Sequence, residues 1–264
     1  MEVVNHEVSG ARQVPALSIG DPIEPWLIVI HYTANQSAAE TVSWFQSPQS
    51  KVSAHLVVDL DGSITQMVPF NRRAAHAGTS RWRGKEGCNR FSIGIEIVNP
   101  GPLRRLSDGT FADLRGKRWE GKVVHAHHDN GNPEYELWAA YPEAQLSAVT
   151  EACRALVQAY PISEIVGHYD VAPTRKLDPG PAFPFQPVRA LLAPRDDDGA
   201  DVYAATTTLN VRSGPGVSHA PVAGSPLQPG QRVEVVAVNG SWWHVRTLDE
   251  RVEGWAASHF LHCV

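Results

Sequence analysis

The acidic segment PRDDDGAD, at positions 194–201, divides the chain into two parts with separate apolar patterns. Its carboxylates cannot bury apolar surface, and its proline and glycine interrupt helices and strands. We therefore predict a linker over 194–202, which separates a domain at 1–193 from a smaller domain at 203–264. The chain of 264 residues, 42% of them hydrophobic, is long enough to bury a core in each.

The first domain alternates strand-like apolar runs with helical patterns, which predicts an α/β fold. The segment SAHLVVDLDGSITQMV predicts a β-hairpin that turns at Asp61 and Gly62. Ser37 is a candidate N-cap for a helix over 38–45, and apolar spacing predicts a longer helix over 142–160. The other elements that we expect are three strands and a short helix, at 26–30, 93–98, 164–166 and 187–192.

The second domain consists of short β-type runs separated by Gly and Pro turns, the pattern of a small all-β barrel: TTTLNVRSGPG, QRVEVVAVNG, SWWHVRT and EGWAASHFL. Trp242 and Trp243 are adjacent, so strand spacing places one ring in the core and the other outward. The outward ring is a candidate ligand platform. The alternative is that both rings only pack.

Composition excludes several classes of function. A net charge of -5 and a pI near 6.2 provide no basic surface for nucleic acid. No segment approaches the ~18 to 20 apolar residues of a membrane span, and MEVVNHEVSGARQVP lacks the pattern of a signal peptide. We therefore expect a chain that is cytoplasmic as synthesised. Cys88, Cys153 and Cys263 lack metal-type spacing and are interpreted as reduced, structural thiols.

Three residues stand where a hydrolytic metal site needs its ligands, which are three N or O donors around one open position. His31 ends the apolar run LIVIH, and His168 follows a second short apolar run. Asp178 lies ten residues later, in a loop stiffened by proline and glycine. Taken singly, each histidine is more often a hydrogen-bonded surface residue than a ligand.

Two further side chains are candidates for catalysis. Glu96 interrupts the apolar strand run IGIEIV, where an unpaired carboxylate would be costly. Its alternative is a position on the solvent face of a half-buried strand. Lys176 lies two residues before Asp178, so its ammonium group can reach the same cleft and offset the charge of an oxyanion. A lysine in a polar loop is otherwise usually just solvated.

Five motifs form a highly specific set: IVIHYT, VSAHLVVDLDGSITQMVP, HAGTSRWRG, CNRFSIGIEIVN and GHYDVAPTRKLDPGPAF. Over residues 25–185 the chain resembles the zinc N-acetylmuramoyl-L-alanine amidases, which include phage amidase-type lysozymes and the cytosolic anhydro-muropeptide amidase of peptidoglycan recycling. The resemblance implies a mixed central sheet flanked by helices, the fold shared with peptidoglycan recognition proteins. It implies zinc on His31, His168 and Asp178, a general acid/base at Glu96, and a cationic transition-state stabiliser at Lys176.

The expected reaction is hydrolysis of the amide between N-acetylmuramic acid and L-alanine, in peptidoglycan or in soluble muropeptides. A water activated by the metal would attack the lactyl carbonyl while Glu96 accepts its proton and later passes it to the leaving nitrogen. No organic cofactor is expected. The resemblance also suggests that four residues shape the substrate groove: His55, Arg73, His76 and Trp82.

The chain departs from the recycling enzymes in two places. Gly87 stands where those enzymes carry an arginine, which argues against a strict preference for anhydro-muropeptides. A long polar insertion at 100–141 follows the Glu96 strand, and long loops are often functional. Within it His125, His127 and Asp129 nearly spell a metallo-β-lactamase metal signature, but Asn130 replaces the final histidine. We expect no second metal site there.

The segments LNVRSGPG and GWA, with Trp242 and Trp243 between them, resemble bacterial SH3 domains over residues 206–261. The resemblance implies binding of cell-wall peptide. Residues 203–264 contain four arginines and four carboxylates, so bulk charge does not drive such binding. Alternative roles for this domain are gating of the active site and dimerisation.

Two rival functions remain open from sequence. One is a peptidoglycan-binding protein without activity, which commonly loses the third ligand, whereas Asp178 is present here. The other is a cysteine amidase, against which Cys153 falls on an apolar helix stripe and Cys88 has no adjacent base motif. A recycling enzyme, a phage lysin and an exported effector that reaches the wall without a signal peptide all fit the sequence equally.

Overall fold

The computed structural model of the protein describes residues 1–128, 134–192, 202–239 and 241–263. It divides into two compact units, Met1–Phe183 and Pro184–Val264. The linker that we predict over 194–202 lies, apart from its last residue, outside the described residues, so its bounds and those of the flanking domains stay predictions.

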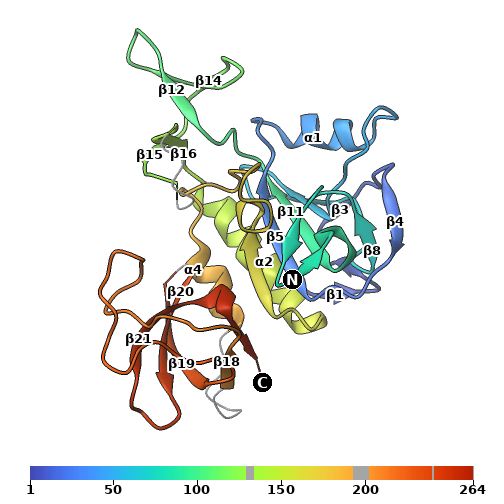
Figure 1. The fold of residues 1–264 in the computed structure, drawn as a ribbon. Helices are drawn as coiled ribbons and strands as arrows, with labels where there is room; N and C mark the ends of the chain where they lie inside the picture. The colour runs from blue at the N-terminus through green and yellow to red at the C-terminus, as the bar shows by residue number, and fades with distance from the viewer. Residues whose placement is uncertain (129–133, 193–201, 240, 264) are drawn as a thin grey trace. The chain divides into compact units, whose positions relative to one another are not determined.

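A mixed six-stranded sheet forms the centre of the first unit (Figure 1). Its strands, in spatial order, are β17 (Glu164–Gly167), β5 (Leu27–Tyr32), β11 (Ser92–Ile97), β6 (Leu56–Val58), β7 (Ile64–Gln66) and β3 (Arg12–Gln13). The four strands from β17 to β6 are parallel, whereas β6 and β7 form an antiparallel hairpin. Strands β5, β6 and β17 are almost wholly buried, which explains their unbroken apolar sequences.

The helices of the first unit are α1 (Ala38–Phe45), α2 (Glu143–Ala159) and α3 (His168–Val171), with a 3-10 turn η1 (Cys88–Arg90). Ser37 caps α1 by accepting a hydrogen bond from the Glu40 amide at 3.4 Å, as its sequence predicts. On α2, Gln145 is fully buried and donates to the carbonyl oxygens of Val58 and Val98. This side chain fastens the start of α2 to the sheet.

The register of the parallel strands decides which side chains share a face. Glu96 on β11 is paired with His31 on β5 and with Val57 on β6, so these three side chains point to one face of the sheet. Val57 and Phe45 of α1 belong to one apolar cluster, which places α1 on that same face. His31 and Glu96 are therefore neighbours beside α1.

Several short strands surround the sheet: β1 (Val3–Val4), β2 (Glu7–Val8), β4 (Ile19–Pro22), β8 (Arg72–Ala74), β9 (Arg81–Trp82) and β10 (Lys85–Glu86). They pair as β1 with β2, β4 with β8 and β9 with β10. The sequence patterns did not predict them, because strands of two to four residues are too short to show periodicity.

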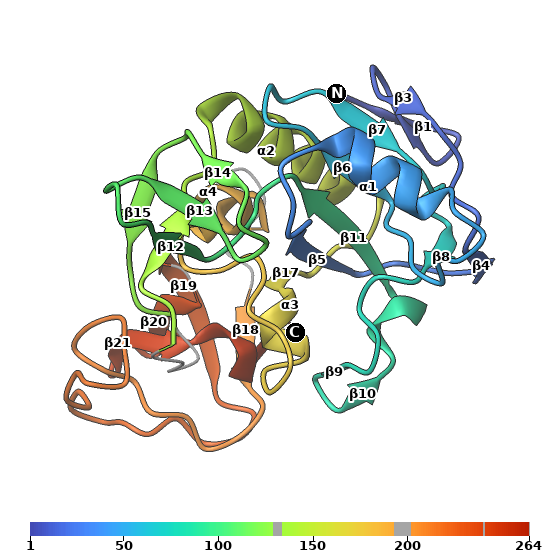
Figure 2. The same cartoon turned by 90° about the horizontal axis from the view of Figure 1, so that it is seen from above.

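The insertion is not the polar loop that its composition suggests. It contains β12 (Leu103–Arg105), β13 (Phe111–Asp113), β14 (Arg118–Trp119), β15 (Val123–His125) and β16 (Leu137–Ala139). These form a three-stranded sheet and a hairpin around a small apolar cluster that includes Leu103, Trp119 and Ala139. Figure 2 shows these strands gathered at one end of the unit, away from β1 and β3.

The second unit carries an antiparallel five-stranded sheet in the order β21 (Glu253–Ala257), β20 (Trp242–Thr247), β19 (Arg232–Asn239), β18 (Val202–Ala205) and β22 (Leu261–Cys263). Its helical segments are α4 (Phe185–Arg189), η2 (Ala190–Leu192) and η3 (Ser258–Phe260). Trp243 is buried in the core and Trp242 is half-buried, as the strand alternation predicts. Among the described residues, no helix has the length and apolarity needed to cross a membrane.

Candidate active site

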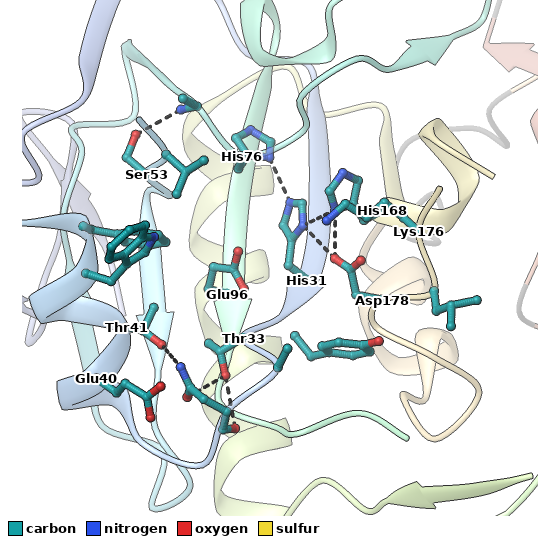
Figure 3. A pocket seen from close by; sticks show the side chains of 18 of the residues that line it. His31, Thr33, Glu40, Thr41, Ser53, His76, Glu96, His168, Lys176 and Asp178 are labelled. Atoms are coloured by element: carbon teal, nitrogen blue, oxygen red, sulfur yellow. Dashed lines mark hydrogen bonds and ion pairs between the residues drawn. The ribbon is translucent and has the colours of Figure 1, made fainter. Parts of the chain in front are cut away.

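His31, His168 and Asp178 converge at the carboxyl end of the parallel strands (Figure 3). The Nδ1 atoms of the two histidines are 2.8 Å apart, and each lies 2.9 Å from Oδ2 of Asp178. All three side chains are buried. Within the described part of the chain, no other group of three His, Cys, Asp or Glu side chains is arranged to hold a metal ion.

The sheet explains why residues so distant in sequence meet. Strand β17 runs parallel to β5, and Gly167 lies beside Ile30. The residues that follow these two, His168 and His31, are therefore also neighbours. His31 is still within its strand, whereas His168 is the first residue of α3. The Tyr169 amide donates to the carbonyl oxygen of Asp178 at 3.0 Å, which returns the loop after α3 to the ligands.

The second ring nitrogen of each histidine fixes its tautomer. His168 Nε2 lies 3.1 Å from the Ala77 carbonyl oxygen and donates to it. His31 Nε2 lies 2.9 Å from His76 Nδ1. The Ser92 hydroxyl donates to a backbone carbonyl oxygen, so it accepts from His76 Nε2, and His76 Nδ1 in turn accepts from His31 Nε2. Donation at Nε2 leaves Nδ1 of both metal-facing rings, His31 and His168, unprotonated and free to coordinate a metal, the usual arrangement for ligating histidines.

His76 continues this chain of hydrogen bonds into the core. Its Nε2 atom lies 3.2 Å from Ser92 Oγ, and Ser92 donates to the Cys88 carbonyl oxygen at 2.6 Å. Asn89 accepts from the amides of His76 and Ala77 and so fixes the HAG turn. His76 therefore orients a metal ligand in addition to lining the cavity.

Burial and mutual contacts within the cluster shift the pKa values of His31 and Asp178. Burial, with the neighbouring His168, lowers the pKa of His31 to about 4, so its ring is neutral at pH 7. Burial would raise the pKa of Asp178, but the contacts and charge interactions with His168 and His31 outweigh burial and hold that pKa below its usual range. A neutral imidazole at His31 and a carboxylate at Asp178 are protonation states that metal coordination requires.

Glu96 lies beside the cluster on the same face of the sheet, with α2 behind the strands (Figure 3). Its Oε2 atom is buried and has no hydrogen-bond partner among the residues that the structure describes. Burial, followed by the charge of Asp178, raises the pKa of Glu96 well above its usual range, while Lys176 acts in the opposite direction. A carboxyl group with a raised pKa next to a candidate metal site is a candidate for proton transfer.

A cavity of about 900 Å³ gives access to the cluster. Lys176 and Glu96 line it together with the three ligands. Its outer wall includes Trp44 of α1, which is 50% exposed, and Arg115 of the insertion. Arg115 pairs with Glu40 at 2.5 Å, so the insertion contributes to this wall.

The family model for N-acetylmuramoyl-L-alanine amidases matches residues 21–181, more than half of the chain. The chain belongs to this amidase family. A second family model, that of bacterial SH3 domains, matches residues 207–262.

Two curated amidases of Escherichia coli resemble the chain. The 1,6-anhydro-N-acetylmuramyl-L-alanine amidase AmpD is 32% identical over 206 residues, which cover 70% of this chain and 93% of AmpD. The N-acetylmuramoyl-L-alanine amidase AmiD is 32% identical over 171 residues, covering 61% of this chain and 50% of AmiD. A crystal structure of a selenomethionine AmpD derivative superposes with a TM-score of 0.50 and 28% identity, over 73% of this chain and 99% of AmpD.

The other residues expected at the groove of this amidase lie outside the cavity wall, except His76. His55 is buried, accepts from the Gly94 amide and donates to the Arg72 carbonyl oxygen, so it holds the sheet together. Arg73 contacts Asp21 at the surface, and Trp82 donates to Glu164. Gly87 adopts a φ of 72°, a conformation that an arginine would adopt only with strain.

The alternative sites are placed as follows. Cys88 and Cys153 are free and buried, and burial raises the pKa of both thiols, which suits structural roles. His125 and His127 are exposed, and Asp129 lies outside the described residues. His128 and Asp113, both buried polar residues of the insertion, were not predicted, because no local motif marks a side chain whose partner is distant in sequence.

Proposed function

We propose that the chain is a zinc-dependent hydrolase that cleaves the amide between N-acetylmuramic acid and L-alanine in peptidoglycan or soluble muropeptides. The observation that carries the proposal is the buried cluster of His31, His168 and Asp178 with Glu96 in the same cavity. Membership of the amidase family supports the substrate class, since the relatives AmpD and AmiD are named for this bond.

The ligand set fits zinc. Two imidazole nitrogens and one carboxylate oxygen are the donor types of hydrolytic zinc sites, and such sites leave further coordination space open. His31, His168 and Asp178 would hold the ion, and His76 and the Ala77 carbonyl oxygen would keep the rings in the ligating tautomer. When bound, zinc supplies Lewis acidity for the carbonyl and lowers the pKa of water toward ~7.

Glu96 moves the proton in the proposed reaction. Its carboxylate accepts the proton of the attacking water and then delivers it to the nitrogen of the departing L-alanine. The raised pKa that burial imposes on Glu96 favours the first step, because it makes the carboxylate a stronger base toward the attacking water. The lack of a partner on Oε2 among the described residues leaves that atom available to water.

Lys176 offsets the negative charge that develops on the attacked carbonyl oxygen. It lines the cavity and its charge is felt by both Glu96 and His31, which places it close to the reacting groups. A cation held where charge develops stabilises the transition state more than the ground state.

The proposed role of the second domain is to bind cell-wall peptide. Trp255 and His244 are opposite each other on β21 and β20, with ring centroids 5.1 Å apart, and both are half-buried. Together with the half-buried Trp242 they form an aromatic surface on strands that we propose close into an SH3-like barrel.

The test is elemental analysis combined with mass spectrometry of digests. We expect one zinc per chain, release of L-alanine-terminated peptides, and loss of both on His168→Ala. His127→Ala is the control and leaves zinc content and cleavage unchanged. Digests of intact sacculi and of soluble anhydro-muropeptides identify the preferred substrate. A protein that retains no zinc, and whose cleavage survives both chelation and His168→Ala, contradicts the proposal.

A further inference from the structure

The insertion returns to the body of the first unit at His128, one of its few buried polar residues. His128 is 4% exposed although it follows the exposed His125 and His127. Its ring lies edge-on to Tyr169, with centroids 4.8 Å apart, and also contacts Trp138. A histidine held this firmly between two aromatic rings has a fixed direction for its hydrogen bonds.

His128 Nε2 lies 2.7 Å from the carbonyl oxygen of Leu177. A carbonyl oxygen only accepts, so Nε2 carries the proton and donates. Leu177 stands between Lys176 and Asp178, and its carbonyl belongs to the planar peptide unit that contains the Asp178 nitrogen. The bond therefore fixes the peptide plane immediately before the ligand.

A second hydrogen bond holds the other side of the same ligand. The Tyr169 amide donates to the Asp178 carbonyl oxygen at 3.0 Å, and it is the Tyr169 ring that His128 contacts. Asp178 is thus held on both flanking peptide planes, once by α3 and once by the insertion.

We propose that His128 is a positioning residue that the insertion supplies to the metal-ligand loop, where it sets the direction of Asp178 and Lys176 through the Leu177 carbonyl. The inference rests on the proposed metal site and adds a function for the insertion, which also reaches the cavity wall through Arg115 and the residue after Asp178 through the Tyr141 hydroxyl, which donates to the Pro179 carbonyl oxygen at 2.8 Å. His128 does not touch the reacting atoms.

The experiment compares His128→Gln with His128→Asn in the full chain. The amide nitrogen of Gln can occupy the place of Nε2 and donate to Leu177, whereas the shorter Asn cannot reach it. We expect His128→Asn to bind zinc about ten-fold more weakly in chelator competition, the lower end of the range for partners outside the ligand shell. His128→Gln should bind zinc within about two-fold of the wild type, and His125→Gln should be unchanged.

Amide hydrogen exchange in the zinc-free protein supplies a second readout. Because His128→Asn loosens the loop, the Tyr169 amide should exchange faster in that variant than in His128→Gln, while amides of β19 exchange equally in both. Equal zinc affinity and equal Tyr169 exchange in the two variants would overturn the inference, because ring packing rather than the hydrogen bond would then matter. If the wild type binds no zinc, the proposed function fails, and Tyr169 exchange alone decides this inference.

Discussion

At the scale of single residues, the proposed role of Glu96 in proton transfer comes at the expense of stability. Its pKa is raised in the folded protein, so the stability contributed by its carboxyl group is fully present below the unfolded pKa and is lost as pH rises through the folded pKa. Above that folded pKa, the protein tolerates a carboxylate whose Oε2 has no partner among the described residues. Such unfavourable groups are retained where chemistry needs them.

Replacing Glu96 by Gln separates its effect on turnover from its effect on the stability of the fold. Turnover should fall by roughly 10² to 10⁴, the range for a general acid/base, while zinc and substrate affinity are retained. Above the folded pKa of Glu96, the free energy of unfolding of the zinc-free variant should exceed that of the zinc-free wild type by on the order of 1 kcal/mol, because the buried charge is gone. Kinetics and thermal denaturation measure the two quantities. Turnover near the wild-type rate would show that another group moves the proton.

Lys176 should control the acidic limb of the pH profile. Glu96 accepts a proton only when ionised, so kcat/KM falls as pH drops through its pKa, and the Lys176 charge lowers that pKa. In Lys176→Met the pKa rises and the limb moves to higher pH, while turnover at the optimum drops by roughly 10² to 10³. The control Lys122→Met, in the insertion, should leave the limb in place. An unshifted limb in Lys176→Met would place Lys176 too far from Glu96 to act.

The candidate ligands and catalytic residues were predictable from the sequence, whereas the hydrogen-bond partners that orient them were not. His31, Glu96, His168, Lys176 and Asp178 each end or interrupt an apolar run or lie in a specific motif, and the structure brings them to one cavity. The hydrogen bonds that orient the two histidine rings, from His31 to His76 and from His168 to the Ala77 carbonyl oxygen, join residues 45 and 91 positions apart, and no local pattern encodes a pairing over that distance.

At the scale of elements, prediction succeeded where local patterns are long. The hairpin turning at Gly62, which has a φ of 84°, the capped helix α1 and the 17-residue helix α2 follow from turn chemistry, capping and apolar spacing. The insertion was misread because its strands of two or three residues bury few side chains each. Its apolar cluster is visible only once the strands are paired.

Asp113 is the residue that fastens the insertion to the region before α1. Its buried carboxylate accepts from the amides of Arg115 and Lys117 and from Gln36 Nε2 at 2.9 to 3.0 Å. Asp113→Ala should lower the free energy of unfolding by about 1 to 3 kcal/mol, since buried donors lose their acceptor. Arg115→Ala removes only an exposed ion pair and should cost less than about 1 kcal/mol. Chemical denaturation compares the two, and equal losses would contradict the assignment.

At the scale of the whole molecule, the two compact units predict separable functions. A chain ending at Pro194 keeps the whole of the first unit and every residue that lines the cavity. It should fold, bind zinc and cleave soluble muropeptides at close to the full-length rate, while binding to intact sacculi weakens if the second unit targets the wall. Circular dichroism, cleavage assays and sedimentation with sacculi measure these properties. Failure of this fragment to fold would show that the units share a core.

The large separation of the candidate ligands along the chain affects how metal binding would protect the protein from unfolding and proteolysis. His31 and Asp178 are 147 residues apart, so an ion that ties them together closes a ring containing most of the first unit, including the insertion. Cross-links that close long rings restrict the unfolded chain the most, as long-range disulfides do. The bound ion would thus also act as a reversible cross-link that stabilises the fold. A shortage of metal would expose the chain to proteases and stop catalysis at the same time.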